Sequence, residues 1–233
     1  FKLWLKKALD DYLTQRTLER KREKPLMYND GQGYIRYQKG SMVFYALSDY
    51  IGEDVLNGAL KKYVEKVKFQ YPPYTTSIDM VNHIREVTPD SLQYTINDMF
   101  ETITLYENRI KEVTSTELDT GKYQLDIEFE VSKYRNDEKG KKFYEDSISY
   151  KTEDMRKPIL SAPLADYIDI GIFAEKEDEE GKMKEVELYL KKHKITEINN
   201  TITIIVDEEP IEVGVDPYNK LIDTNSNDNR RRL

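Results

Sequence analysis

The chain of 233 residues contains no cysteine, which excludes a disulfide framework and a thiolate metal site. It also lacks an apolar run of the length that a bilayer-spanning helix needs, so direct insertion into a membrane is not expected. Basic residues are fewer than acidic ones, and the net charge is -8. Because no basic stripe is present to meet phosphates, a nucleic-acid partner is not expected. The remaining composition, 38% hydrophobic and 34% charged, is typical of a globular protein with one large or two small domains.

Helical periodicity dominates residues 1–107. Apolar residues recur three and four positions apart, which places them on one face of each helix. Pro25 ends the first helix and Gly52 separates the second from the third. Because no helix can bury its apolar stripe alone, the sequence predicts a packed N-terminal lobe of about five helices. They are expected at about 1–22, 38–51, 53–67, 76–87 and 88–103.

The apolar period changes from 3.6 to 2 near Glu107, which predicts a domain boundary there. Residues 123–132 alternate strictly between apolar and polar, as expected for a half-buried strand. About seven such strands predict an immunoglobulin-like antiparallel β-sandwich over 108–223, and hence an α+β fold. Residues 224–233 are expected to be a disordered polar tail whose three arginines are solvated. The strands are expected at about 110–118, 123–132, 143–150, 167–174, 186–195, 201–206 and 211–215.

The stretch that the chain is organised around is residues 34–52, YIRYQKGSMVFYALSDYIG. A polar approach leads directly into an amphipathic helix that begins near Gln38. At its start stands Tyr-x-Lys-Gly, in which Tyr37 places an aromatic hydroxyl at the helix entrance and Gly40 has no side chain. Taken alone, Tyr37 is one of 18 tyrosines, most of which are expected to be packing residues.

The flanking sequence adds to this motif. Tyr-x-Lys-Gly, the following Gly-Glu pair and a second amphipathic helix that ends in Tyr-Val-Glu-Lys resemble a segment of the aminopeptidase N family of gluzincin metallopeptidases. In that family the segment lies downstream of the zinc site. The likeness is greatest to bacterial members that are fused to an ABC-type transport permease, whose ends resemble residues 216–223, DPYNKLID. It covers nearly the whole chain in collinear order.

The resemblance implies roles for single residues. Tyr37 matches the family tyrosine whose hydroxyl donates to the oxyanion formed when zinc-activated water attacks the scissile carbonyl. Tyr34 is expected to line the same cleft as a substrate-binding residue. From residue type alone, Lys39 is expected to be solvated, and Gly40 is expected to let the helix approach a neighbour. The implied fold is the downstream part of a thermolysin-like catalytic domain followed by its sandwich.

Zinc binding in such a peptidase needs His-Glu-x-x-His and a further glutamate downstream. The chain has only His83 and His193, which fall in different predicted domains, and neither begins the motif. His83 and Glu86 have a His-x-x-Glu spacing, but a lone imidazole is not expected to hold a metal, and the lysines beside His193 repel cations. We therefore predict no metal and no cofactor in this chain. By resemblance, zinc belongs to a longer parent whose ligands lie upstream.

Two functions follow as hypotheses. The first is a fragment of a zinc aminopeptidase-like protein, truncated and inactive alone, whose parent acts on peptide N-termini. Its partners would be a peptide substrate and the upstream half of the catalytic domain. The second is a non-catalytic docking module of a transporter-fused protein. An intact His-Glu-x-x-His upstream would favour the first. Either way, the chain is expected to be a soluble segment of a membrane-associated bacterial protein.

Overall fold

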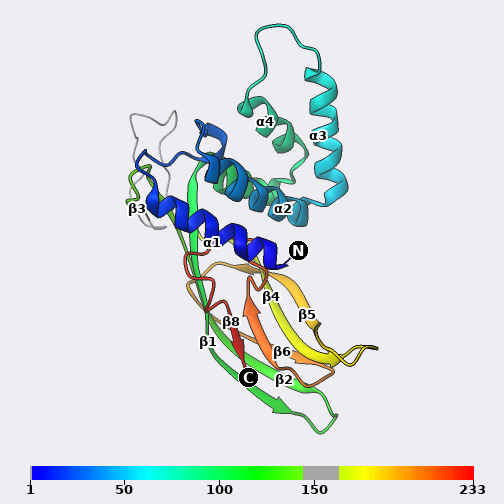
Figure 1. The fold of residues 1–233 in the computed structure, drawn as a ribbon. Helices are drawn as coiled ribbons and strands as arrows, with labels where there is room; N and C mark the ends of the chain where they lie inside the picture. Colours follow the sequence, from blue (N-terminus) through cyan, green and yellow to red (C-terminus); the bar gives the residue numbers. More distant parts are fainter. Residues whose placement is uncertain (1, 144–162) are drawn as a thin grey trace. The chain divides into compact units, whose positions relative to one another are not determined.

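The computed structural model describes residues 2–143 and 163–233, which form two compact units. Unit 1 contains the described residues of Phe1–Thr104 together with Arg135–Phe143, and unit 2 contains Leu105–Tyr134 and the described residues of Ala162–Leu233. The fold is α+β, as predicted, with helices in unit 1 and two antiparallel sheets (Figure 1). The first division, after Thr104, lies close to the predicted boundary near Glu107. The sequence did not predict that Arg135–Phe143 would belong with the helices.

Five α-helices are present among the described residues, in agreement with the predicted helical lobe. None of these helices is long and apolar enough to cross a membrane. The predicted helix at 88–103 is instead divided into short pieces, and Ile103 already belongs to a strand. The helical elements are α1 (Lys2–Leu18), η1 (Leu26–Tyr28), η2 (Ile35–Lys39), α2 (Gly40–Ile51), α3 (Glu53–Val67), α4 (Ser77–Val87), η3 (Asp90–Leu92), α5 (Gln93–Ile96) and η4 (Asn97–Glu101).

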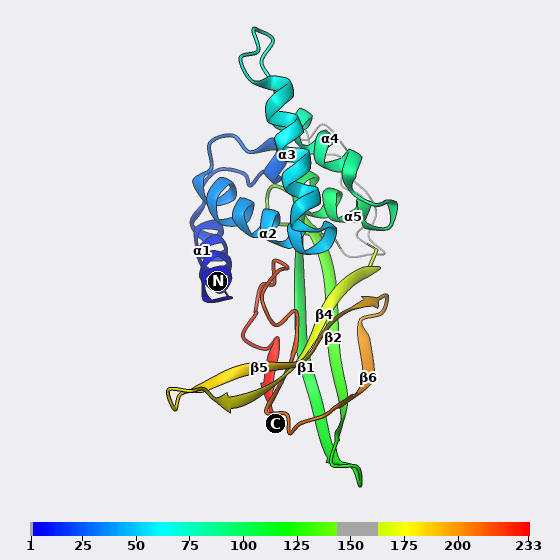
Figure 2. The same cartoon turned by 90° about the vertical axis from the view of Figure 1, so that its right-hand side faces the viewer.

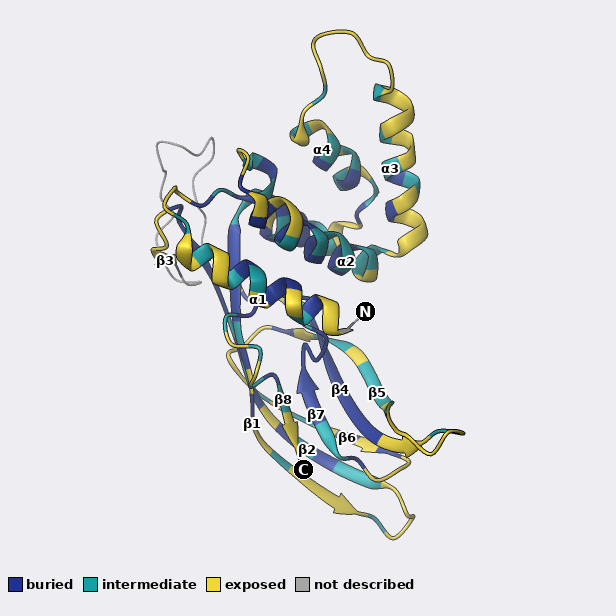
Figure 3. Cartoon of the chain, in the orientation of Figure 1, coloured by how far each residue is buried: buried dark blue, intermediate teal, exposed yellow. Residues whose placement is uncertain are grey.

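One apolar core holds α2, α3 and α4 together with the short segments η1 and η4. Figures 2 and 3 show these helices side by side, with buried faces turned inward and the outer face of α3 exposed. Gly52 separates α2 from α3 because its φ of 94° is a backbone conformation that favours glycine. The start of α4 is fixed by a capping box between Thr76 and Asp79. The buried core residues are Met27, Val43, Leu47, Leu56, Val81, Ile84, Ile96 and Phe100.

Each sheet has four strands. In the first sheet β2 pairs with β1, β3 and β6, and the order of the second sheet is β5-β4-β7-β8. Of the predicted strand at 143–150, only Phe143 lies within the described residues, where it ends β3. The strands are β1 (Ile103–Glu117), β2 (Tyr123–Asn136), β3 (Lys142–Phe143), β4 (Asp166–Glu177), β5 (Met183–Ile195), β6 (Asn199–Val206), β7 (Glu212–Val215) and β8 (Arg230–Arg232).

The core of unit 2 lies between the inward faces of the two sheets. The alternation predicted for β2 is confirmed, because Leu125, Ile127, Phe129 and Val131 are buried and contribute to one apolar cluster with β4 and β7. The same interior holds charged groups that the alternating pattern did not reveal. Lys133 Nζ lies 3.0 Å from Asp166 Oδ1, and both side chains are buried. The Tyr106 hydroxyl donates to the same Asp166 oxygen at 3.0 Å, so this buried pair has its hydrogen bonds satisfied.

The predicted disordered tail at 224–233 is wrong. Gly214 of β7 pairs with Arg230, and β8 adds a strand to the second sheet. Arg230 is not simply solvated, because its Nη2 lies 2.9 Å from Glu212 Oε2. Ahead of the strand, the Asn225 N–H donates to Asp223 Oδ1 at 2.8 Å. The polar residues that suggested disorder are instead ordered by hydrogen bonds to one another and to the sheet. Asparagine and aspartate side chains hydrogen-bond to nearby backbone groups, which stabilises turns.

Candidate functional site

Tyr37 lies in η2, a π-helical segment that leads into α2. Its side chain is 63% exposed and borders a cavity of about 390 Å³, which we call the Tyr37 cavity. Single π-helical turns are rare and frequently occur at functional sites. The cavity is lined by Leu26, Met27, Arg36, Tyr37, Gly40, Ser41, Phe44, Ser77, Met80, Val81 and Phe100.

The Tyr37 cavity is apolar with few polar groups at its edge. Two of those groups are already engaged, because Ser41 Oγ donates to the Gln38 carbonyl oxygen at 2.8 Å and Ser77 Oγ donates to the Met27 carbonyl oxygen at 2.7 Å. The guanidinium of Arg36 and the hydroxyl of Tyr37 remain as the polar groups that a bound molecule would meet. This combination of an apolar wall and a few placed polar groups is typical of ligand sites.

Arg36 and Tyr37 form a pair. Arg36 Nη2 donates to the Tyr37 hydroxyl oxygen at 3.1 Å, and the guanidinium carbon lies 4.5 Å from the ring centroid. A phenol both accepts and donates, so the Tyr37 oxygen that accepts from Arg36 still has its own proton to donate. Chains of hydrogen bonds polarise one another, and the cation strengthens Tyr37 as a donor. The arrangement is therefore suited to stabilise an oxygen on which negative charge develops.

A second π-helical segment, η4, forms the opposite part of the cavity wall. Its Phe100 packs edge-to-face against Phe44 of α2, with ring centroids 5.8 Å apart. The segment is held by a buried ion pair in which Arg135 Nη2 lies 2.6 Å from Asp98 Oδ1. Two π-helical segments thus contribute to the lining of one cavity. Neither could be predicted from apolar periodicity, which describes regular helices only.

Tyr34 does not reach the Tyr37 cavity. It is only 4% exposed, and its ring lies against that of Tyr12 with centroids 5.8 Å apart. Its hydroxyl is buried without a hydrogen-bond partner among the described residues, and burial raises its pKa. The structure thus separates the two tyrosines that the sequence placed in one cleft: Tyr37 faces a cavity and Tyr34 faces the interior.

The prediction that Lys39 is solvated is wrong, because its side chain is fully buried. Its ammonium nitrogen lies 5.8 Å from the centroid of the Tyr12 ring and has no hydrogen-bond partner among the described residues. Burial lowers the pKa of Lys39 to about 8, against the opposite influence of the Glu23 carboxylate. The sequence contained a signal for this burial: position 39 lies three and four residues before Met42 and Val43, and therefore on the apolar stripe of α2.

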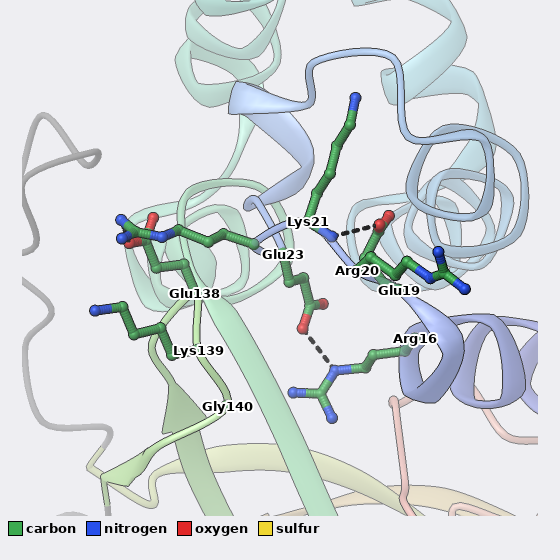
Figure 4. A pocket seen from close by; sticks show the side chains of 9 residues that line it. Arg16, Glu19, Arg20, Lys21, Glu23, Glu138, Lys139 and Gly140 are labelled. Carbon is green, nitrogen blue, oxygen red and sulfur yellow. Dashed lines mark hydrogen bonds and ion pairs between the residues drawn. The ribbon is translucent and has the colours of Figure 1, made fainter.

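Glu23, whose carboxylate acts on Lys39, belongs to a polar network of its own. The buried Tyr12 hydroxyl donates to Glu23 Oε1, and Arg16 Nε lies 2.6 Å from Glu23 Oε2. The network borders a second cavity, of about 340 Å³, in which the Arg16 guanidinium points toward Glu23 (Figure 4). Lys21 extends away from this cavity in the same view. Five cationic and three acidic side chains line the second cavity, where Arg16 pairs with Glu23 and Arg22 pairs with Glu138.

Gly40 is not required for a close approach. A Cβ atom placed on it would lie 3.6 Å from the Ile35 carbonyl oxygen and 3.7 Å from Leu26 Cδ1, both ordinary contacts. Because Gly40 has helical φ and ψ, we expect Gly40→Ala to raise the free energy of unfolding by about 0.5–1 kcal/mol through helix propensity. Chemical denaturation monitored by circular dichroism measures the change, and destabilisation would show that the site needs glycine.

The two histidines were predicted to fall in different domains, and they lie in different units. His83 of α4 packs its ring edge-to-face on Tyr63, at 5.6 Å between centroids. His193 is on the edge strand β5, where its Nε2 lies 2.7 Å from the Tyr189 hydroxyl. Burial, and after it Lys191, lowers the pKa of His193. Within residues 2–143 and 163–233, no group of three or more histidine, aspartate or glutamate side chains is arranged to hold a metal ion.

Unit 2 has a polar cavity of about 330 Å³ between β1 and the loop that follows Asp223. Asp223 is fully buried, and burial raises its pKa to about 7 even though backbone N–H groups donate to it. One of these is the N–H of Asn108, 2.8 Å from Asp223 Oδ2, and another is that of Asn225. No role for Asp223 was predicted from the sequence. Its carboxylate serves to hold the loop ahead of β8 against β1.

The comparisons with known proteins concern the whole chain. A scan of protein-family models finds none that matches it, and a search of curated proteins finds no significant match.

Proposed function

We propose that the chain is part of a zinc aminopeptidase-like protein that hydrolyses peptides at their N-termini, and that Tyr37 acts as its oxyanion donor. One observation supports this most strongly: the Tyr37 hydroxyl is exposed at a π-helical entrance, accepts from Arg36 and borders an apolar cavity. A tyrosine that served only in packing would bury its ring, as Tyr12 and Tyr34 do.

The chemistry of Tyr37 follows from where charge appears in peptide hydrolysis. The scissile carbonyl oxygen carries little charge in the substrate and becomes an oxyanion as the tetrahedral intermediate forms. A hydrogen bond from the Tyr37 hydroxyl therefore strengthens as the barrier is climbed, which lowers the barrier rather than only improving substrate binding. Arg36 Nη2 donates to the Tyr37 hydroxyl oxygen at 3.1 Å, which polarises the hydroxyl and strengthens it as a donor. The Tyr37 cavity would receive an apolar side chain of the peptide beside the bond that is cut.

The residues of this chain do not fit a zinc site. His83 and His193 belong to different units, and neither has a second histidine one helical turn away. We therefore assign the metal to a longer parent protein. In the same proposal, unit 1 is the downstream part of a thermolysin-like domain, unit 2 is an immunoglobulin-like sandwich, and the parent is membrane-associated.

Metal analysis checks this assignment. After the purified chain has been incubated with zinc and then dialysed, we expect no stoichiometric zinc in elemental analysis, because two separate imidazoles do not make a site. A variant with both His83→Ala and His193→Ala provides the baseline for adventitious binding. One equivalent of zinc that is retained by the chain and lost in the variant would contradict the assignment.

Activity of the intact parent tests the proposal as a whole. Release of the N-terminal residue from an unblocked peptide, no release from the same peptide with an acetylated N-terminus, and loss of activity on chelation that zinc restores are the expected results. An intact parent that hydrolyses neither peptide would instead favour the docking module.

A further inference from the structure

The connection between α3 and α4 exposes aromatic side chains that none of the described residues of unit 1 covers. Phe69 is 93% exposed, Tyr71 is 87% exposed and Tyr74 is 71% exposed. We call these three residues the aromatic tip. Figures 1 and 2 show the connection as a loop that protrudes from the helices of its unit. Single exposed apolar residues are ordinary, but three aromatic residues within six positions form a patch that needs an explanation.

The loop holds the aromatic tip outward. Phe69 has a φ of 59°, a left-handed conformation that is costly for an aromatic residue. Because its ring is exposed, packing of the ring does not offset this cost. The Gln70 side-chain amide donates to the Pro73 carbonyl oxygen across the turn. At the base, the Tyr63 hydroxyl lies 2.7 Å from Thr75 Oγ1 and ties the end of α3 to the start of the next helix. The tip is therefore an ordered projection.

The residues next to the aromatic tip carry a net positive charge, unlike the chain as a whole. Residues 61–74 contain four lysines and one glutamate, a local charge of +3 in a chain whose net charge is -8. Lys61, Lys62, Lys66 and Lys68 are all exposed. Lys66 and Lys68 are within three residues of Phe69, and the α-helical rise places Lys62 and Lys61 about 10 Å and 12 Å behind Phe69. At an ionic strength of about 0.01 M, where the Debye length is about 30 Å, all four charges act on a surface that the tip would touch.

We propose that the aromatic tip and these four lysines form a docking site for the surface of an anionic lipid bilayer. Aromatic rings and lysines together are the side chains that settle at a membrane–water interface, where the rings enter the headgroup boundary and the ammonium groups meet lipid phosphates. The positive charge concentrated near one loop of an acidic chain favours an anionic surface over a neutral one, and the exposed aromatic rings favour a lipid surface. The site is independent of Tyr37 and of peptide hydrolysis.

Vesicle co-sedimentation of the full 233-residue chain tests the proposal. One set of vesicles contains phosphatidylcholine only, and the other contains equal parts of phosphatidylcholine and phosphatidylglycerol. We expect binding to the second set, weak or no binding to the first, and a loss of binding with added salt because the contact is partly electrostatic.

Two groups of variants separate the rings from the charges. Replacing Phe69, Tyr71 and Tyr74 by serine should weaken binding more than about tenfold, since about 60 Å² of buried apolar surface already gives that factor. Replacing Lys61 and Lys62 by glutamine should weaken it by about 30-fold at low salt, at about fivefold for each lysine. The matched controls are Met183→Ser, Ile198→Ser and Ile205→Ser combined, and Lys182→Gln with Lys184→Gln, which remove exposed groups of the same kinds from unit 2.

A spectroscopic measurement locates the contact. In a Trp4→Phe background, which removes the only tryptophan, Phe69→Trp should show a blue shift of its fluorescence when anionic vesicles are added. A chain that does not bind these vesicles would overturn the proposal, and so would binding that the tip variants retain or a tryptophan that stays in water. Self-association that the serine variant abolishes, without vesicle binding, would assign the tip to a protein contact and equally overturn it.

Discussion

Replacing Tyr37 with phenylalanine in the intact parent is expected to lower kcat by about 10²- to 10³-fold, the usual result of removing one oxyanion donor. KM should change much less, because the lost hydrogen bond forms fully only in the transition state. The substitution removes one oxygen atom from a side chain that is 63% exposed, so no cavity is created and the fold should be unaffected. Steady-state hydrolysis of an unblocked peptide measures both constants.

Two companion variants sharpen this test. Tyr71→Phe makes the same chemical change at an exposed tyrosine that does not line the Tyr37 cavity, and it should leave kcat unchanged. Arg36→Met removes the cation that polarises the Tyr37 hydroxyl but leaves the hydroxyl in place. Its kcat should fall between those of the wild type and Tyr37→Phe. An unchanged kcat in Tyr37→Phe would show that the Tyr37 hydroxyl takes no part in catalysis.

Replacing Lys39 with methionine is expected to raise the free energy of unfolding of the helical unit by about 3 kcal/mol at pH 7. The folded state lowers the pKa of Lys39 from 10.5 to about 8, and each pKa unit corresponds to about 1.4 kcal/mol. Methionine has a similar length and no charge to desolvate, and it would fill the same volume beside Tyr12. Replacing a buried charge by an apolar group of similar size is known to stabilise proteins by this order.

The pH dependence gives this prediction its sign. Below pH 8, Lys39 is protonated in both the folded and the unfolded state, so its burial cost is present in full. Between pH 8 and 10.5 the unfolded chain binds a proton that the folded chain does not, and stability rises with pH. The advantage of Lys39→Met should therefore shrink over this range and vanish above it. The charged groups nearest to Lys39 are Glu23 and Arg16, which the variant leaves in place.

Denaturant unfolding at several pH values measures this difference between the variant and the wild type. Lys133→Met is the matched control with the opposite sign, because Lys133 is also buried but is paired with Asp166 at 3.0 Å. Removing it takes the cation from a buried carboxylate and should destabilise the chain at pH 7. Equal stability of Lys39→Met and the wild type at pH 7, or a gain that persists above pH 10.5, would contradict the burial cost.

Where apolar periodicity is regular, the sequence was sufficient to predict the helices and strands of the α+β fold. The alternation in β2 correctly predicted which side chains enter the core, because a strand turns successive residues to opposite faces. The apolar stripes of α2, α3 and α4 predicted three helices whose bounds lie close to those observed. Gly52 was predicted to end α2, and its positive φ gives the reason.

The parts that could not be predicted are those that depend on tertiary contacts. Lys39 was assigned to solvent from its residue type, although its position on the apolar stripe indicated burial. The placement of Tyr34 inside and Tyr37 outside depends on the π-helical turn of η2, which changes the angle between successive side chains and leaves no mark on the sequence. Residues 224–233 were predicted to be disordered from polarity alone, because pairing with β7 is a long-range contact.

The most direct test of the central claim is the affinity of the intact parent for a phosphinic peptide, whose tetrahedral phosphorus and charged oxygen imitate the oxyanion. If Tyr37 donates to that oxygen, Tyr37→Phe will weaken inhibition by about the same factor, 10²- to 10³-fold, by which it lowers kcat, while KM for the matching peptide changes little. If the inhibition constant is the same in the wild type and in Tyr37→Phe, then the hydroxyl does not meet the oxyanion and the proposed role of Tyr37 is wrong.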